Sequence, residues 1–336
     1  MTMTAELQEQ EQTTASVVEQ IAEAIRSRDT FVIAGHLRPD GDCLGSCLGL
    51  YAVLRGMGKS VRFYTAGPIP EHFNYLPNFD VIETEVPKEL PDAYIYVDSG
   101  DPERVNEDFK PTGFVINIDH HLSNSRFGVL NWVDIEATAA AEQIFYLALA
   151  LDQPITRDIA TCIFTGLMTD TGGFRFSNTD YTTFQIAGEL VRLGAKPAEI
   201  AGAVYESRTR EAVYLTGEVY SHLHFELDGK LVWAEITDEL FKKVGGDKNE
   251  PEGLASDIRG IEGVEVSVLF FETPEHQCRL GLRSKGTVNV SELATMLGGG
   301  GHHNASGAFI RDDYNAAREQ ALKVVRPYIA KSLGLK

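Results

Sequence analysis

Residues 31–54, FVIAGHLRPDGDCLGSCLGLYAVL, decide the fold of this 336-residue chain. The apolar run at the start of this stretch predicts a buried strand, and the small-residue-rich apolar segment at its end predicts a helix. His36, Asp40 and Asp42 lie on the turn between them. Carboxylate oxygens suit hard divalent cations, and a histidine nitrogen favours Mn²⁺ over Ca²⁺ or Mg²⁺. The turn is a candidate metal site, although a solvated turn in which Asp42 caps the helix fits the same residues.

The overall composition indicates a two-domain cytoplasmic protein. The chain is 43% hydrophobic, has no apolar run long enough to cross a membrane, and begins with a polar, acidic segment unlike a signal peptide. Its four cysteines suggest reduced, buried thiols rather than a disulfide framework. The net charge of −19 argues against duplex DNA as a partner, but metal ions can still hold a small anionic substrate.

Two further apolar segments, AYIYVDS (93–99) and FVINIDHH (114–121), predict strands that end in polar side chains. Asp98 ends the first strand, and the run Asp119–His121 ends the second. Strands of this kind alternate with predicted helices, which indicates an α/β fold with a parallel sheet and helices on both faces. Because ligands gather at the carboxyl ends of parallel strands, these residues and His36 can converge in one crevice.

The remaining periodicity divides the chain into two domains. In the first half, helices are expected at Leu7–Arg28, Ala137–Leu151, Arg157–Met168, Thr182–Gly194 and Pro197–Tyr205. After about residue 207 the pattern changes to strands at 231–237, 264–272 and 277–285, helices at 290–297 and 312–333, and a glycine-rich segment at 298–307. We expect a metal-binding domain over residues 1–206, a linker over 207–229 that is helical at 211–223, and a smaller α/β substrate-binding domain over 230–336.

Six residues are candidate metal ligands: His36, Asp40, Asp42, Asp98, His120 and Asp170. Six ligands can hold two divalent ions if one carboxylate bridges them, and Asp98, alone at its strand end, is the natural bridge. The remaining ligands divide into two sets, His36 with Asp40 and Asp42 with His120 and Asp170. Asp170 ends an apolar helix, where the helix dipole disfavours an acid, so its charge calls for a compensating cation.

This constellation suits hydrolysis at phosphorus. Two metal ions would activate a water molecule for the attack, with Asp98 and His121 as the catalytic residues. His121 can serve as general acid or bind a phosphate oxygen. Asp119 can orient the residues of the site without binding a metal ion itself. In the second domain, glycines 298–301 would let the backbone approach an anion, and Arg283 and His302 would add donors, although a plain loop also fits the glycines.

Four motifs in order, GHLRPDGDCLGS, YVDS, IDHH and MTDTGGF, resemble those of the DHH phosphoesterase family. The segment GLRSKGTVNVSELATMLGGGGHHNASG resembles the substrate-binding motif of the DHH-associated C-terminal domain. The phosphate-binding positions of that motif match Arg283, Gly300, Gly301 and His302, to which we add Ser284. The resemblance, which covers about residues 15 to 330, implies two Mn²⁺ ions, with Mg²⁺ or Co²⁺ as alternatives, in a cleft between a DHH domain and a smaller α/β domain.

Within this family, a stand-alone chain of this length resembles the nanoRNases that are also pAp phosphatases. The resemblance implies hydrolysis of short single-stranded oligoribonucleotides to mononucleotides, and of 3′-phosphoadenosine 5′-phosphate (pAp) to AMP. The alternatives are a cyclic di-AMP or pApA phosphodiesterase, a RecJ-like exonuclease, an inorganic pyrophosphatase or polyphosphatase, and a non-enzymatic nucleotide sensor. The acidic composition argues against the exonuclease, the GGGGH segment against the inorganic phosphatase, and the complete ligand set against the sensor. The sequence does not decide the oligomeric state, for which a homodimer is one alternative.

Overall fold

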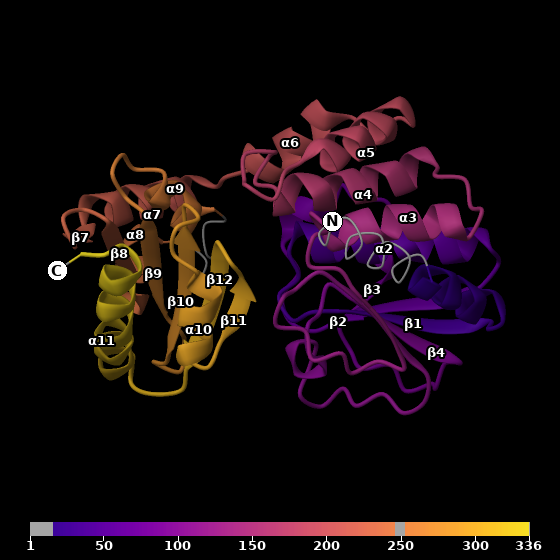
Figure 1. Ribbon diagram of the computed structural model, residues 1–336, viewed down its shortest axis with the longest axis horizontal. Coiled ribbons are helices and arrows are strands. Elements are labelled where there is room, and N and C mark those ends of the chain that lie inside the picture. Colours follow the sequence, from indigo (N-terminus) through magenta and orange to yellow (C-terminus); the bar gives the residue numbers. More distant parts are fainter. Residues whose placement is uncertain (1–15, 246–252, 336) are drawn as a thin grey trace, which may run out of the picture. The chain divides into compact units, whose positions relative to one another are not determined.

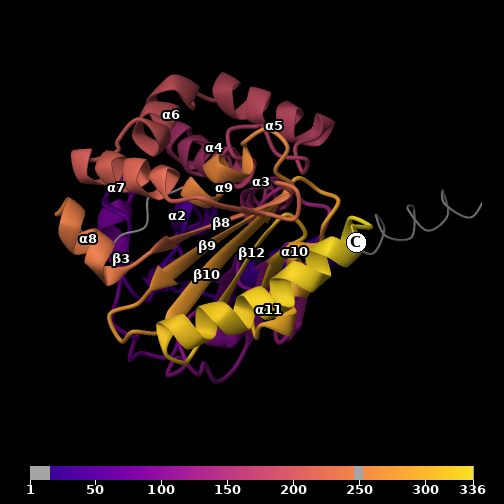
Figure 2. The ribbon, with the colours of Figure 1, turned by 90° about the vertical axis from the view of Figure 1, so that its left-hand side faces the viewer.

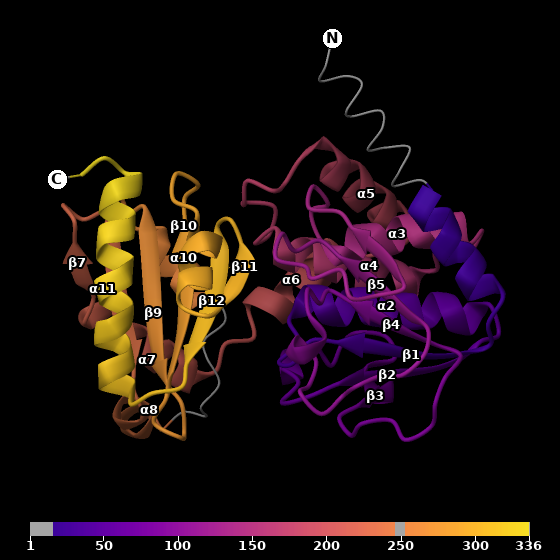
Figure 3. The same ribbon diagram turned by 60° about the horizontal axis from the view of Figure 1, so that its bottom comes forward.

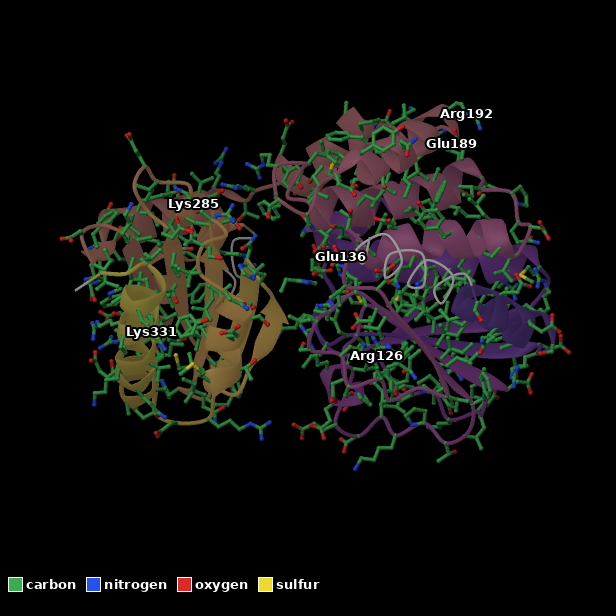
Figure 4. All side chains as sticks on the ribbon, in the orientation of Figure 1. Arg126, Glu136, Glu189, Arg192, Lys285 and Lys331 are labelled. Carbon is green, nitrogen blue, oxygen red and sulfur yellow. The ribbon has the colours of Figure 1, made fainter. Side chains whose placement is uncertain are left out.

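The computed structural model describes residues 16–245 and 253–335, which form two compact units that divide between Ser207 and Arg208 (Figure 1). Part of the expected helix Leu7–Arg28 lies outside the described residues, and a helix is present at 16–26. Among the described helices, none combines the length and the apolar character that a membrane span requires. Charged side chains, such as Glu189 and Arg192, which form an ion pair, lie on the outside of each unit (Figure 4).

The first unit is built on a six-stranded parallel sheet, which confirms the predicted fold class. Its strands are β1 (Thr30–Gly35), β2 (Ser60–Thr65), β3 (Ile82–Glu83), β4 (Ala93–Val97), β5 (Val115–Asp119) and β6 (Leu130–Val133). Their spatial order is β3-β2-β1-β4-β5-β6, and every neighbouring pair is parallel. The chain therefore builds outward from β1 in both directions, and the carboxyl ends of β1 and β4 flank the switch point where such sheets place ligands.

The two faces of this sheet are covered differently. One face carries α2 (Gly41–Gly56) and α3 (Ala140–Ala150), and α4 (Arg157–Asp170) packs on both of them. Figures 1 and 3 show α5 (Tyr181–Arg192) and α6 (Pro197–Tyr205) outside α4. The opposite face, with Tyr64 and Tyr96, packs against Val105 and Phe109 beyond the 3₁₀ helix η3 (Pro102–Arg104). Helices were expected on both faces; among the described residues, α2, α3 and α4 lie on one face, and the 3₁₀ helix η3 lies on the other.

Glycines allow α2 and α4 to pack closely. A Cβ atom on Gly45 would lie 2.4 Å from the carbonyl oxygen of Cys162 and 2.9 Å from the backbone nitrogen of Gly166. A Cβ atom on Gly41 would lie 2.4 Å from a side-chain carbon of Thr169. No further side-chain atom fits at these separations, so the N-terminal half of α2 lies directly beside α4.

The second unit contains a mixed six-stranded sheet. Its strands are β7 (His224–Glu226), β8 (Leu231–Ile236), β9 (Val266–Glu272), β10 (Cys278–Ser284), β11 (Gly300–His302) and β12 (Ala305–Ile310), in the order β11-β12-β10-β9-β8-β7. Only β8 and β9 pair in parallel among these described strands. Figure 2 shows α10 (Val290–Met296) and α11 (Tyr314–Ser332) on one face, and α7 (Arg210–Ser221), α8 (Asp238–Val244) and α9 (Leu254–Arg259) on the other.

Two segments of this unit differ from the sequence-based expectation. Residues 207–229, expected as a linker with a helix at 211–223, contain α7 and β7, but Leu215 and Val219 of α7 are buried in the core of the second unit. The glycine-rich segment, for which a plain loop was one interpretation, forms the hairpin of β11 and β12. A Cβ atom on Gly299 would lie 2.0 Å from the carbonyl oxygen of Gly307, so glycine is required where the two strands approach each other.

Candidate metal centre

The candidate ligands stand where three neighbouring strands of the first unit end. His36 follows β1, Asp98 follows β4 and His120 follows β5, and these strands are adjacent and parallel. Asp98 has a φ of 55°, in the left-handed region that aspartate tolerates better than most residues. Its backbone N–H donates to the carbonyl of Ile118 at 3.0 Å, which ties this turn to the end of β5. The sheet itself therefore brings the three side chains together.

Asp98 lies between two groups of side chains. Its Oδ2 atom lies 3.5 Å from His36 Nε2, and its Oδ1 atom lies 3.5 Å from His120 Nε2. His36 Nε2 also lies 3.8 Å from Asp40 Oδ1. His120 Nε2 lies 3.7 Å from an oxygen of Asp42 and 3.9 Å from an oxygen of Asp170. Each of the four aspartates thus has an oxygen within 4 Å of His36 or His120, and Asp98 lies near both histidines.

The outer nitrogens of both histidines are already engaged. His120 Nδ1 lies 3.1 Å from the carbonyl oxygen of Ala137, and His36 Nδ1 lies 3.0 Å from that of Leu37. A carbonyl only accepts, so each Nδ1 carries a proton, and Nε2 is the nitrogen of each ring that faces the carboxylates. A buried cluster of acceptors needs a positive centre, which protons or a metal ion can supply. The donor set therefore fits a divalent cation.

Burial and mutual repulsion perturb these carboxylates. Burial, and next the charge of Asp98, raise the pKa of Asp42 well above its ordinary value, and burial raises the pKa of Asp170 to about 6. Burial acts in the same direction on Asp98, but hydrogen bonds with His120 and His36 outweigh it and hold the pKa of Asp98 well below its usual range. Within the described residues, the ion pairs of these three carboxylates involve only histidines.

The two aspartates of the α2 turn have different structural roles. Asp40 is the N-cap of α2, because its Oδ1 accepts from the backbone nitrogens of Asp42 at 3.1 Å and Cys43 at 3.0 Å. The two oxygens of Asp42 instead accept from the backbone nitrogens of Ala140 at 2.7 Å and Ala141 at 3.0 Å. Asp42 thus caps α3 rather than α2, and α3 begins at Ala140, three residues later than expected.

A second network supports His121. Its Nδ1 lies 2.7 Å from Oδ1 of the fully buried Asp119. Asn124 Nδ2 donates to Asp119 Oδ2 at 2.6 Å and to Asn117 Oδ1 at 2.8 Å, and Asn117 donates to the carbonyl of Ser99 at 3.0 Å. Sequence reasoning missed both asparagines, because an isolated polar residue in a strand or loop gives no periodic signal. Their closeness in sequence to the DHH motif was the only indication.

The expected substrate-binding residues gather at one edge of the second unit's sheet. Ala305 of β12 pairs with Arg283 on one side and with His302 on the other, so these two residues lie at the same level on β10 and β11. Gly301 has a φ of 140°, and a Cβ atom there would lie 2.7 Å from the carbonyl oxygen of Ala305. Ser284 is fully buried, and its hydroxyl is 3.1 Å from Asn304 Oδ1, so the fold already uses this expected substrate contact.

Comparison with known proteins gives a family for this arrangement. The model of the DHH family, N-terminal domain, matches residues 30–167, and that of the DHHA1 domain matches residues 228–331. The chain is 36% identical over 315 residues to the bifunctional oligoribonuclease and PAP phosphatase NrnA of Thermus thermophilus, covering 93% of this chain and 94% of that protein. It is 30% identical over 286 residues to the protein of the same name from Bacillus subtilis, covering 84% and 90%.

A solved structure agrees with the sequence comparisons. The crystal structure of an exopolyphosphatase-related protein from Bacteroides fragilis has a TM-score of 0.83 and 28% identity, covering 94% of this chain and 96% of that one. The two domain matches, the similarity along nearly the whole chain and the ligands at the strand ends agree with one another. The chain therefore belongs to the DHH family and consists of a DHH domain followed by a DHHA1 domain.

Proposed function

We propose that this protein is a metal-dependent phosphoesterase that hydrolyses short oligoribonucleotides to mononucleotides and converts pAp to AMP. It is a hydrolase that acts on ester bonds, the class of the relatives named above. The observation that supports metal dependence is the central position of Asp98, whose two oxygens face different histidines. The substrates are proposed by analogy with the two relatives named as oligoribonuclease and PAP phosphatase.

We propose two Mn²⁺ ions as the cofactor, with Mg²⁺ or Co²⁺ as alternatives. One ion would be held by His36, Asp40 and Asp98, and the other by Asp42, Asp98, His120 and Asp170. When bound, such ions supply Lewis-acid activation of water and neutralise charge on the phosphate oxygens. Carboxylate oxygens alone would suit Mg²⁺, and the two imidazole nitrogens favour Mn²⁺.

His121 is the proposed general acid for the leaving oxygen. Asp119 accepts the Nδ1 proton of His121, so Nε2 is the nitrogen that would exchange a proton with the substrate. Burial raises the pKa of Asp119, but the charge and hydrogen bond of His121 outweigh it, and the pKa lies below its ordinary value. Asp119 therefore stays ionised and stabilises a protonated His121, and the amide of Asn124 holds Asp119 in place.

A parallel product assay tests this function. The chelated protein is expected to be inactive, and Mn²⁺ is expected to restore release of mononucleotides from dinucleotides and of AMP from pAp. Longer oligomers, cyclic di-AMP, pApA, pyrophosphate and polyphosphate complete the panel. Faster turnover of cyclic di-AMP or pApA would favour the cyclic-dinucleotide alternative. Turnover of pyrophosphate or polyphosphate alone, or nucleotide binding without hydrolysis in Mn²⁺, would contradict the proposal.

Arg283 is proposed to bind a substrate phosphate together with the backbone of Gly300 and Gly301 and with His302. Arg283→Ala is expected to lower kcat/KM by about 10–100-fold, the effect of losing one charge-assisted hydrogen-bonding group. The metal content, measured by elemental analysis, should stay unchanged, because the expected ligands all lie in the first unit.

Arg279→Ala is the matched control for Arg283→Ala. Arg279 lies on the same strand four residues away, where its guanidinium stacks on the Phe271 ring at 4.4 Å. This variant should keep kcat/KM within about twofold of the wild type, since surface substitutions away from a site have small effects. Equal losses in both variants, or loss of metal from Arg283→Ala, would show that Arg283 does not act on the substrate.

A further inference from the structure

One cysteine lies at the metal centre and belongs to neither ligand set. His36, Cys43 and Asp98 each offer one ligand atom, and these atoms lie within 4.8 Å of one another. The Cys43 side chain is fully buried, and the Asp98 side chain is 4% exposed. Within the described residues, the other cysteine of this helix, Cys47, does not take part in such a group. The thiol of Cys43 thus stands next to the position shared by His36 and Asp98.

The backbone fixes the sulfur of Cys43 in this place. A Cβ atom on Gly35, the residue before His36, would lie 2.7 Å from Cys43 Sγ, so the sulfur occupies space that any other residue at the end of β1 would fill. The backbone nitrogen of Cys43 donates to Asp40 Oδ1 at 3.0 Å, which ties Cys43 to a second expected ligand. The end of β1, the N-cap Asp40 and the sulfur of Cys43 are therefore held close together by the backbone.

We propose that Cys43 is an additional ligand at the His36–Asp98 position and gives this position affinity for thiophilic divalent ions such as Zn²⁺, Co²⁺ and Cd²⁺. The inference rests on the metal centre of the proposed function. Two ligand atoms of a four-coordinate zinc ion lie about 3.5 Å apart, so small side-chain rotations bring atoms within 4.8 Å to a common ion. A set of nitrogen and oxygen donors has no comparable preference for soft ions.

The proposed binding step is an exchange of a proton for a metal ion. The thiol S–H bond breaks, the proton passes to solvent, and the thiolate forms a bond to the ion without any change in oxidation state. At a site that otherwise takes Mn²⁺, the sulfur would make thiophilic ions strong competitors. The alternative is that Cys43 only fills space in the core below β1.

Absorption spectroscopy of the Co²⁺-loaded protein distinguishes these two roles. In the wild type, a thiolate-to-cobalt charge-transfer band in the near ultraviolet is expected to grow together with the visible bands of bound Co²⁺. Cys43→Ala should keep the visible bands and lose the ultraviolet band. Cys47→Ala, one helical turn further on in an equally buried position, should keep both.

A competition experiment gives a second readout that is independent of activity. Cys43→Ala is expected to weaken Cd²⁺ binding by at least about tenfold, and to leave Mn²⁺ binding within about threefold of the wild type. Cys43→Ser, which keeps the shape of the side chain and replaces only the sulfur by oxygen, should behave in the same way and serves if the alanine variant does not fold. Circular dichroism checks the fold of each variant.

Negative results of these experiments bear either on Cys43 alone or on the whole metal centre. A wild-type protein with the visible bands of Co²⁺ but no sulfur band, or a Cys43→Ala variant with an undiminished sulfur band, would overturn the role of Cys43 and leave the proposed function intact. A wild-type protein that binds neither Co²⁺ nor Mn²⁺ would overturn the metal centre and the proposed function together.

Discussion

Asp98→Asn is expected to lower kcat by at least about 10³-fold, because loss of metal-based charge stabilisation removes several kcal/mol of transition-state binding. The amide keeps one oxygen acceptor but has no charge, so it cannot serve the His36 and His120 groups at once. Asparagine tolerates the left-handed backbone of this position as aspartate does, whereas alanine would add strain. The loss should therefore reflect the chemistry of the site rather than a broken turn.

Elemental analysis and steady-state kinetics in Mn²⁺ check this result. The variant should bind less metal than the wild type. Asp101→Asn is the matched control, because Asp101 caps η3 in the same loop and its Oδ1 accepts from the Glu103 nitrogen at 2.9 Å. This control should keep kcat within about twofold of the wild type. An Asp98→Asn protein with a tenth or more of wild-type turnover would rule out Asp98 as the bridging ligand.

Gly45→Ala is expected to destabilise the first unit by about 3 kcal/mol, at the upper end of the usual cost of overpacking. The new methyl group would meet backbone atoms of Cys162 and Gly166, and a helix backbone cannot move aside as a flexible side chain can. α2 and α4 must then separate, which also moves Asp42 away from Asp170. We therefore expect weaker Mn²⁺ binding as well as a lower midpoint in urea unfolding.

Gly188→Ala provides the control for a glycine in a helix. Gly188 is exposed on α5, and a Cβ atom there would have no heavy atom within 4 Å. Alanine should stabilise this helix by about 0.5–1 kcal/mol, because it lowers the entropy of the unfolded chain without a clash. If Gly45→Ala were as stable as Gly188→Ala, the close approach of α2 and α4 would not depend on glycine.

The strands and the candidate ligands at their ends were predictable because a strand that is buried on both faces is apolar along its length. Segments such as FVIA and AYIYV are almost wholly apolar, and a polar side chain follows each of them, His36 after one glycine and Asp98 directly. The spacing of the motifs could not give the register of neighbouring strands. That register is what places Asp98 between His36 and His120.

Other features could not be predicted because tertiary contacts decide them. The segment of α7 has mixed polarity and reads as a linker until Leu215 and Val219 meet the second unit's core. A glycine-rich segment predicts a flexible loop rather than a strand. The segment of β11 is a strand because it pairs with β12. Cys43 looks like a packing residue, since no sequence pattern shows that its sulfur lies below the end of β1.

Asp42 is a proposed metal ligand and also caps α3, so we expect metal binding to change the stability of the first turn of this helix. The same carboxylate that faces His120 holds the first two amides of α3, at Ala140 and Ala141. A cation bound by this carboxylate would compete with those two amides for its oxygens. It would therefore change the strength of the two hydrogen bonds and the fraying of the helix end. Hydrogen–deuterium exchange of the Ala140 and Ala141 amides should therefore report on metal binding at Asp42.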